Sequence, residues 1–248
     1  MPASIFASSL AAGLRVASLD LCADEILLTL AKRSSIVSVT HLGASPAEFA
    51  LAARAKGVPL NDGSIVSVAR YKPDLLLASR PLSSGGARLA RRLGIRVHVV
   101  SNAQGPAAVR QQVLEMGRLL DTPLAARSWV RRFDALAADR PPTRRALYLS
   151  HSGNSVGPLN SAWLAMAGIE PIELAPGRGR IEQIVRARPH TILHSEYRAN
   201  DWHRGGDWQR HPLIAGLEAE RFKIDGRAFS CGGIAMLGAV EQLRRQRG

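Results

Sequence analysis

A helix, a proline and a buried strand follow one another twice in this chain, and this repeat limits the folds open to it. Proline ends each helix because it lacks a backbone N–H and fixes φ. Such units also recur by chance in α/β proteins, but a true duplication predicts two lobes of similar design. Residues 65–79 align with residues 181–195, with identity at Ile65 and Ile181, Arg70 and Arg186, Pro73 and Pro189, Leu77 and Leu193, and Ser79 and Ser195.

Short apolar segments alternate with amphipathic ones on both sides of the repeat. This alternation is typical of a mainly parallel sheet covered by helices. We expect strands at residues 14–19, 36–40, 75–78, 97–100, 146–150, 172–174 and 191–194. We expect helices at residues 26–30, 65–71, 87–93, 161–167 and 181–187, and a last one at 233–245.

The middle of the chain, residues 105–142, has helical spacing throughout and no strand. Pro106 opens this stretch, Pro123 restarts it, and two prolines at 141–142 end it. We therefore expect an α/β fold in which a long helix bridges two Rossmann-like lobes, with a ligand cleft between them. The expected division is a leader or signal remnant at 1–13, an N-terminal lobe at 14–104, the bridging helical segment at 105–142, and a C-terminal lobe at 143–248.

Composition restricts the functions that remain open. A chain of 248 residues with 46% hydrophobic residues can bury one large core or two small ones. No stretch reaches the roughly 18 uninterrupted apolar residues of a membrane span. The net charge is +13, but the arginines are scattered and few aromatics lie between them. We therefore expect no nucleic-acid partner, and attribute the charge to a solvated surface or an anionic ligand.

Ligands of parallel sheets bind beyond the carboxyl ends of the strands, so two facing lobes would share one cleft. Arginines there could hold an anionic cargo through forked hydrogen bonds, and candidates are Arg80, Arg178, Arg180 and Arg198. Two tryptophans suit a flat macrocycle, although the same rings could equally cap a core. The residues expected in the cleft are Leu21, Cys22, Asp24, His41, Ser79, Arg80, His151, Asn154, Tyr197, Trp202, Trp208 and Cys231.

Three motifs are familiar in this order: LDLCADE at 19–25, YKPDLLL at 71–77 and CGG at 231–233. From about Arg15 onward the chain resembles the periplasmic-binding family of ABC importers for ferric siderophores, haem and cobalamin. The resemblance implies a monomeric, non-catalytic receptor in the periplasm that delivers its ligand to a permease and an ATPase. It also implies a docking glutamate on each lobe, which Glu182 matches in the second lobe. Val66 stands at the first-lobe position, so either Glu48 substitutes or the partner differs.

The two cysteines, Cys22 and Cys231, leave three alternatives open: a disulfide, a soft ligand pair for a metal in the cargo, or two independently packed side chains. Imidazoles could also ligate such a metal, with His41, His151, His203 and His211 as candidates. No motif for a resident metal or cofactor occurs, and no nucleophile elbow or phosphate-binding loop points to an enzyme. The alternative function is a cytosolic α/β enzyme or sensor that acts on a nucleotide-like anion.

Overall fold

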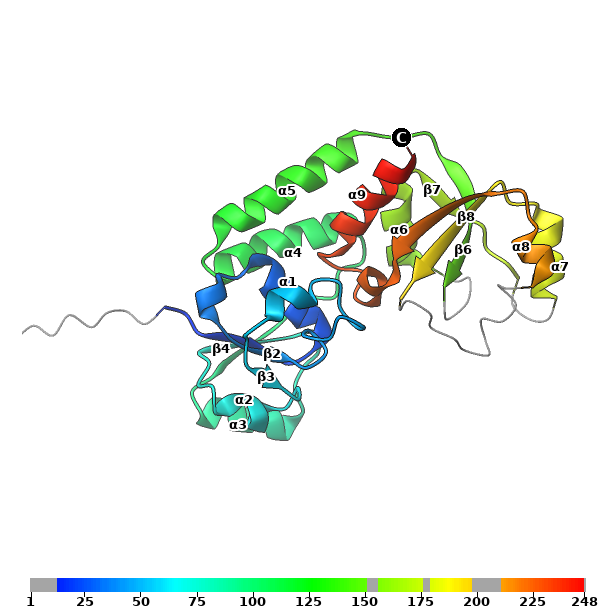
Figure 1. The fold of residues 1–248 in the computed structure, drawn as a ribbon. Helices are drawn as coiled ribbons and strands as arrows, with labels where there is room; N and C mark the ends of the chain where they lie inside the picture. Colours follow the sequence, from blue (N-terminus) through cyan, green and yellow to red (C-terminus); the bar gives the residue numbers. More distant parts are fainter. Residues whose placement is uncertain (1–12, 151–155, 176–178, 198–210, 248) are drawn as a thin grey trace, which may run out of the picture.

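A computed structural model of the protein describes residues 13–150, 156–175, 179–197 and 211–247. Two parallel sheets lie side by side, each flanked by helices, and further helices lie between and above them (Figure 1). The predicted two-lobed α/β fold is therefore confirmed. Among the described residues, none of the helices combines the length and the apolar character that crossing a membrane requires.

The first lobe contains a five-stranded sheet whose order is β3-β2-β1-β4-β5, with every pair parallel. Its strands are β1 (Val16–Ser18), β2 (Ile36–Thr40), β3 (Leu60–Asn61), β4 (Leu75–Ala78) and β5 (Arg96–Val99). Its helices are α1 (Leu21–Leu30), α2 (Ile65–Ala69) and α3 (Ser84–Arg92), with short 3-10 turns at Arg33–Ser35 and Ala52–Ala55. Four-residue β4 is buried along its whole length, as expected for a central parallel strand.

The second lobe contains a four-stranded parallel sheet of order β7-β6-β8-β9. Its strands are β6 (Arg144–Ser150), β7 (Ile169–Pro171), β8 (Thr191–Glu196) and β9 (Glu220–Asp225). Its helices are α6 (Pro158–Met166), α7 (Arg180–Ala187), α8 (Pro212–Ala215) and α9 (Met236–Arg247), and a 3-10 turn at Gly226–Ser230 precedes α9. Strand β7 begins earlier than the predicted 172–174, because Gly168, at φ +69°, turns the chain directly from α6 into the strand.

Two helices, rather than the expected single long one, occupy the segment between the lobes. Helix α4 (Pro106–Leu119) packs along α5 (Pro123–Ala138), and α5 leads on to the second lobe (Figure 1). The break has a local cause. Asp121 adopts a left-handed φ of 53°, and Pro123 has no N–H with which to continue the helix of α4. Pro123 instead occupies the first turn of α5, where a missing N–H costs nothing.

One hydrophobic core runs through both lobes. It joins one face of each sheet to the helices between them, so apolar contact is continuous from one lobe to the other. Two smaller clusters cover the opposite faces of the sheets, one under α2 and α3 and one under α7 and α8. The shared core includes Val16 and Leu75 from the first sheet, Tyr148 and Leu193 from the second, and Val113, Trp129 and Val240 from α4, α5 and α9.

Candidate functional site

The first sheet reverses its strand order between β1 and β4, and this point positions the candidate site. The chain leaves β1 toward β2 and β3 on one side, then returns to β4 and β5 on the other. The loops after β1 and β4 therefore diverge and leave a crevice at the carboxyl ends of the strands. Asp20 joins the two loops: its carboxylate accepts from the backbone N–H of Ala23 at 3.0 Å and from that of Ser79 at 2.7 Å.

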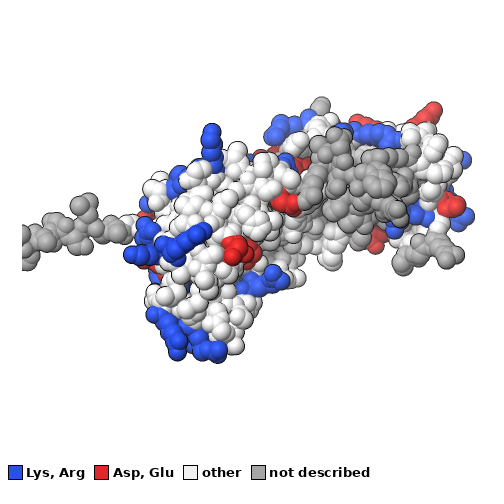
Figure 2. Space-filling view, turned by 60° about the horizontal axis from the view of Figure 1, so that its bottom comes forward, with Lys and Arg blue, Asp and Glu red and all other residues white. Residues whose placement is uncertain are grey.

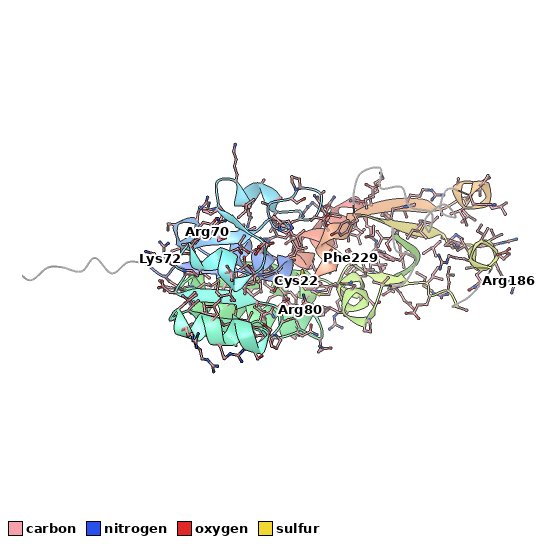
Figure 3. The ribbon with its side chains drawn as sticks, turned by 90° about the horizontal axis from the view of Figure 1, so that it is seen from below. Cys22, Arg70, Lys72, Arg80, Arg186 and Phe229 are labelled. Atoms are coloured by element: carbon pink, nitrogen blue, oxygen red, sulfur yellow. A yellow bond between two sulfur atoms is a disulfide. The ribbon has the colours of Figure 1, made fainter. Side chains whose placement is uncertain are left out.

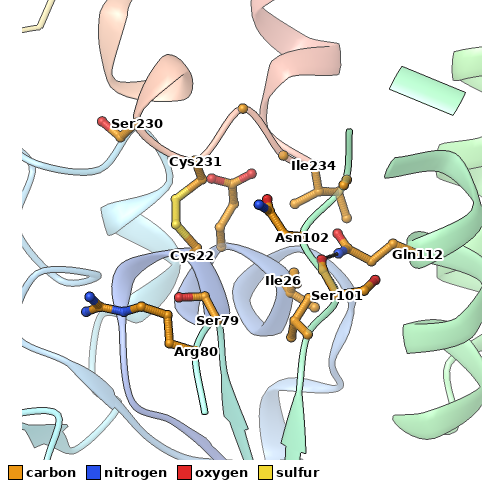
Figure 4. Close-up of a pocket in the computed structure, with 15 residues that line it drawn as sticks. Cys22, Ile26, Ser79, Arg80, Ser101, Asn102, Gln112, Ser230, Cys231 and Ile234 are labelled. Atoms are coloured by element: carbon orange, nitrogen blue, oxygen red, sulfur yellow. Dashed lines mark hydrogen bonds between the residues drawn. A yellow bond between two sulfur atoms is a disulfide. The ribbon is translucent and has the colours of Figure 1, made fainter. Parts of the chain in front are cut away.

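A cavity of about 330 Å³ opens at this crevice (Figure 4). Four residues predicted for the cleft line it, namely Cys22, Ser79, Arg80 and Cys231. The first lobe supplies one wall, α4 a second, and the loop before α9 the third. Lining residues that were not predicted include Glu25, Ser101, Asn102, Gln112, Ser230 and Ile234.

The cavity wall combines apolar side chains with polar groups and carries one exposed cation. The Arg80 side chain makes no hydrogen bond or ion pair with any residue that the structure describes, so its donors are available to a ligand. On the opposite wall, Nε2 of Gln112 donates to the carbonyl of Ser101 at 2.6 Å (Figure 4). This bond fixes the loop after β5 that carries Asn102. The cavity thus offers a guanidinium, an amide and several hydroxyls to an oxygen-rich or anionic ligand.

A disulfide between Cys22 and Cys231 crosses from α1 to the loop after β9, with Cα atoms 5.5 Å apart. This is the first of the three alternatives left open by the sequence, and it leaves neither sulfur as a thiolate ligand. Viewed from below, Cys22 and Phe229 lie at the junction where the lobes meet (Figure 3). The bond therefore forms part of the cavity wall and links the two lobes covalently.

Hydrogen bonds hold the loop that carries Cys231 against α6 of the second lobe and against α5. Nε1 of Trp163 donates to the carbonyl of Gly232 at 2.9 Å, and Nε1 of Trp129 donates to that of Ile234 at 3.1 Å. Gly232 has a left-handed φ of 59°, and a Cβ there would lie 2.7 Å from Leu159 Cδ2. Only glycine fits this turn without strain.

Glu25 is a buried carboxyl group in the cavity wall. It lies one turn after Cys22 on α1, is only 2% exposed, and accepts from the backbone N–H of Ala235 at 2.6 Å. Removal from water raises its pKa to about 7, against the opposing effect of that hydrogen bond. Its position directly before the apolar residues Ile26, Leu27 and Leu28 was the signal in the sequence that could have marked it as buried.

Asp24, a predicted ligand-binding residue, does not line this cavity. Its side chain faces the interior of the first lobe, is fully buried, and accepts from the Ser18 and Thr40 hydroxyls and from the Thr40 backbone N–H. Burial raises its pKa to about 6, although these hydrogen bonds act the other way. Asp24 ties the loops after β1 and β2 together beneath the site.

Three other predicted residues lie away from the cavity. Leu21 packs against the shared core, and His41 is exposed in the turn after β2. The Tyr197 hydroxyl donates to Glu48 Oε2 at 2.8 Å, which connects the second lobe to the 41–51 segment of the first. Arg227 donates to the carbonyl of Pro46 beside it. These contacts form a second link between the lobes.

Several predicted residues lie outside the described part of the chain: His151, Asn154, Trp202 and Trp208, together with His203, Arg178 and Arg198. His211 is described, and its Nδ1 caps α8 by accepting from the Leu213 backbone N–H at 3.3 Å. Within the described ranges, no three His, Cys, Asp or Glu side chains group in a way that could hold a metal ion.

The two positions compared with docking glutamates are both at the surface. Glu182 is exposed in the first turn of α7, beside Arg186 and Leu213. Val66 is 73% exposed on α2. Glu48 is engaged with Tyr197, so it does not present an unpaired carboxylate in place of Val66.

No protein-family model and no curated protein sequence matches this chain. Solved structures do match over nearly its whole length. The periplasmic haem-binding protein HutB of Vibrio cholerae superposes with a TM-score of 0.70 at 16% identity, over 94% of this chain and 98% of its own. The chain has the fold of the periplasmic binding proteins.

Two further structures with this fold are similar. The periplasmic vitamin B12-binding protein BtuF of Vibrio cholerae has a TM-score of 0.59 at 19% identity, over 93% of this chain and 95% of its own. A periplasmic binding protein from Veillonella parvula has a TM-score of 0.67 at 14% identity, over 94% and 90% of the two chains. The family resemblance read from the sequence motifs is thus matched by the three-dimensional fold.

Proposed function

We propose that this protein is the solute receptor of an ABC importer, and that it binds an iron complex, either a siderophore or haem, or a corrinoid such as cobalamin. The observation that carries the proposal is the cavity at the strand-order reversal of the first lobe, which the loop after β9 closes from the second lobe. Its fold neighbours HutB and BtuF bind haem and vitamin B12. The receptor would act in the periplasm, with a permease and an ATPase as partners and without catalysis.

Arg80 is the residue we assign to ligand recognition. It is exposed at the cavity, and a carboxylate or phosphate of the cargo could accept two of its N–H groups at once. Asn102 and Ser79 line the same space and would bond to other polar groups of the ligand. Arg80 would therefore orient an anionic cargo, and the neighbouring donors would contribute to its specificity.

Ligand binding would require only a small movement of the lobes. The lobes share one apolar core, and the disulfide between Cys22 and Cys231 joins them beside the cavity. The hydrogen bond that the Ala235 N–H donates to Glu25 adds a further link one turn along α1. A receptor so restrained pays little conformational entropy on binding, because the site is already assembled.

We also propose that Glu182 docks the second lobe on the importer. The Val66 surface of the first lobe would then meet an apolar rather than a basic patch of the permease, since Glu48 is bonded to Tyr197. Glu182→Ala would reduce ligand-stimulated ATPase activity of the reconstituted importer without changing ligand affinity. Equal stimulation by both forms would exclude this role for Glu182.

A titration of the purified protein tests the ligand class. Haemin, cyanocobalamin, dicyanocobinamide, ferrichrome, ferric enterobactin and ferric citrate are added in turn, and tryptophan fluorescence and the ligand's own absorbance are followed. We expect saturation at one ligand per chain for at least one compound. Absence of binding for all six, or chemical turnover of any of them, would overturn the proposal in favour of an enzyme or sensor.

A further inference from the structure

The proposed receptor function leaves most of the positive charge of this chain unexplained. Acidic residues are unevenly distributed along the sequence, and no Asp or Glu occurs between Asp74 and Glu115 to balance the arginines there. Elsewhere, arginines form ion pairs with carboxylates, as in Arg132 with Glu241 and Arg144 with Glu220. The acid-free stretch includes α3 and the edge strand β5 of the first lobe.

Three arginines share one face of α3. Arg88, Arg91 and Arg92 are three and four positions apart, which places them on the same side of a helix. Arg96 begins β5, at the edge of the sheet next to the end of α3. All four are exposed, and none of their side chains has a hydrogen bond or ion pair within the described ranges. Figure 2 shows Lys and Arg gathered at the lower end of the first lobe without Asp or Glu among them.

Exposed aliphatic side chains occur in the same segment as these cations. Leu93 follows α3 directly and is 47% exposed, and Val99 at the end of β5 is 40% exposed. The segment 84–100 contains no aromatic residue apart from His98. Single-stranded nucleic acids are bound through aromatic stacking as well as charge, which this surface does not offer. Arginines interleaved with aliphatic groups fit the interface of a membrane, where phosphates lie above acyl chains.

We propose that this surface, formed by Arg88, Arg91, Arg92, Leu93 and Arg96 and here called the α3 surface, binds anionic phospholipid headgroups. Each guanidinium can pair with a lipid phosphate through forked hydrogen bonds, and Leu93 can enter the boundary of the acyl chains. A basic residue near an anionic membrane is worth about fivefold in affinity, so the four arginines together contribute roughly several hundredfold. The surface would hold the receptor on the membrane face where an importer permease lies.

Vesicle co-sedimentation of the full chain tests this proposal. Vesicles of an equal mixture of phosphatidylcholine and phosphatidylglycerol are compared with vesicles of phosphatidylcholine alone. The test variant is Arg88→Gln/Arg91→Gln/Arg92→Gln, since glutamine keeps the helix propensity of α3. The matched control is Arg118→Gln/Arg127→Gln/Arg131→Gln, three exposed arginines on α4 and α5, helices that lie on the opposite side of the first sheet from α3 (Figure 1). Both variants lose the same net charge, and circular dichroism verifies that both fold.

We expect the wild type and the control to bind the mixed vesicles but not phosphatidylcholine, and the test variant to bind about 100-fold more weakly. Raising NaCl to about 0.5 M, where the Debye length is only about 4 Å, should release the wild type. Equal losses in the two variants would show that only net charge matters and would overturn the proposal. Retention of vesicle binding in the test variant would also overturn the proposal. So would a test variant that binds vesicles like the wild type but no longer binds a single-stranded RNA.

Discussion

Replacing Cys22 and Cys231 together by alanine should strongly destabilise the protein, because their disulfide closes nearly the whole chain into a loop. The two cysteines are 209 residues apart in the sequence. In the unfolded chain such a cross-link removes a large part of the conformational freedom that folding otherwise has to overcome. Neither side chain is fully buried, so alanine leaves no large cavity and the effect reports the cross-link itself.

The magnitude follows from the length of the loop. For a separation of 209 residues, the loop-closure entropy corresponds to about 5 kcal/mol at 25 °C. Single domains are stable by only about 5–15 kcal/mol, so this loss is a large share of the total. At about 2–4 °C per kcal/mol for a chain of this size, the melting temperature should fall by roughly 10–20 °C.

Thermal and urea unfolding followed by circular dichroism measure this loss. The double alanine variant and the reduced wild type should unfold at the same midpoint, well below that of the oxidised wild type. A thiol count on the unfolded oxidised protein should give no free thiol. A double variant within about 1 kcal/mol of the oxidised wild type would refute the assigned role of the disulfide.

Two further predictions concern the cavity wall. Burial raises the pKa of Glu25 to about 7, so ionisation of this carboxyl group opposes folding. The protonated Glu25 therefore contributes its full stability at a pH below its pKa in the unfolded chain, near 4.5. That contribution is lost as the pH rises through 7. Glu25→Gln should therefore match the wild type at pH 4 and exceed it by about 3 kcal/mol at pH 9 in urea unfolding, and a constant difference would contradict the assignment. Gly232→Ala should destabilise by about 2 kcal/mol, since its φ is +59° and a Cβ would meet Leu159. Gly85→Ala in open space on α3 is the control, and equal melting temperatures of the two variants would refute the strain at Gly232.

The lobed fold was predictable because buried parallel strands are continuous apolar runs. The predicted strands 36–40 and 75–78 match β2 and β4 residue for residue. Strand β9 was missed because it is an edge strand in which exposed charges such as Lys223 alternate with buried Phe222 and Ile224. The break between α4 and α5 was visible as Pro123, but sequence alone did not tell whether the helix would continue past it in one direction.

The site was predictable only as far as it depends on topology. Cys22, Ser79 and Arg80 line the cavity, as the topology led us to expect, because they follow β1 and β4, whose carboxyl ends frame it. The orientation of a side chain on a helix next to that edge is set by packing, which explains why Asp24 faces away from the cavity and why Glu25, which lines it, was not predicted. Gln112 comes from α4, whose position against the first lobe depends on the tertiary fold.

The central claim is tested most directly by calorimetric titration of three proteins, the wild type, Arg80→Gln and Arg127→Gln. The titrant is the compound of the ligand panel that binds to the wild type. Arg127 is an exposed arginine on α5 that does not line the cavity, so its variant controls for net charge. We predict one ligand per chain, unchanged affinity for Arg127→Gln, and an affinity for an anionic ligand at least about tenfold weaker for Arg80→Gln. Equal affinities of all three proteins for that ligand would contradict a binding site at the cavity between the two lobes.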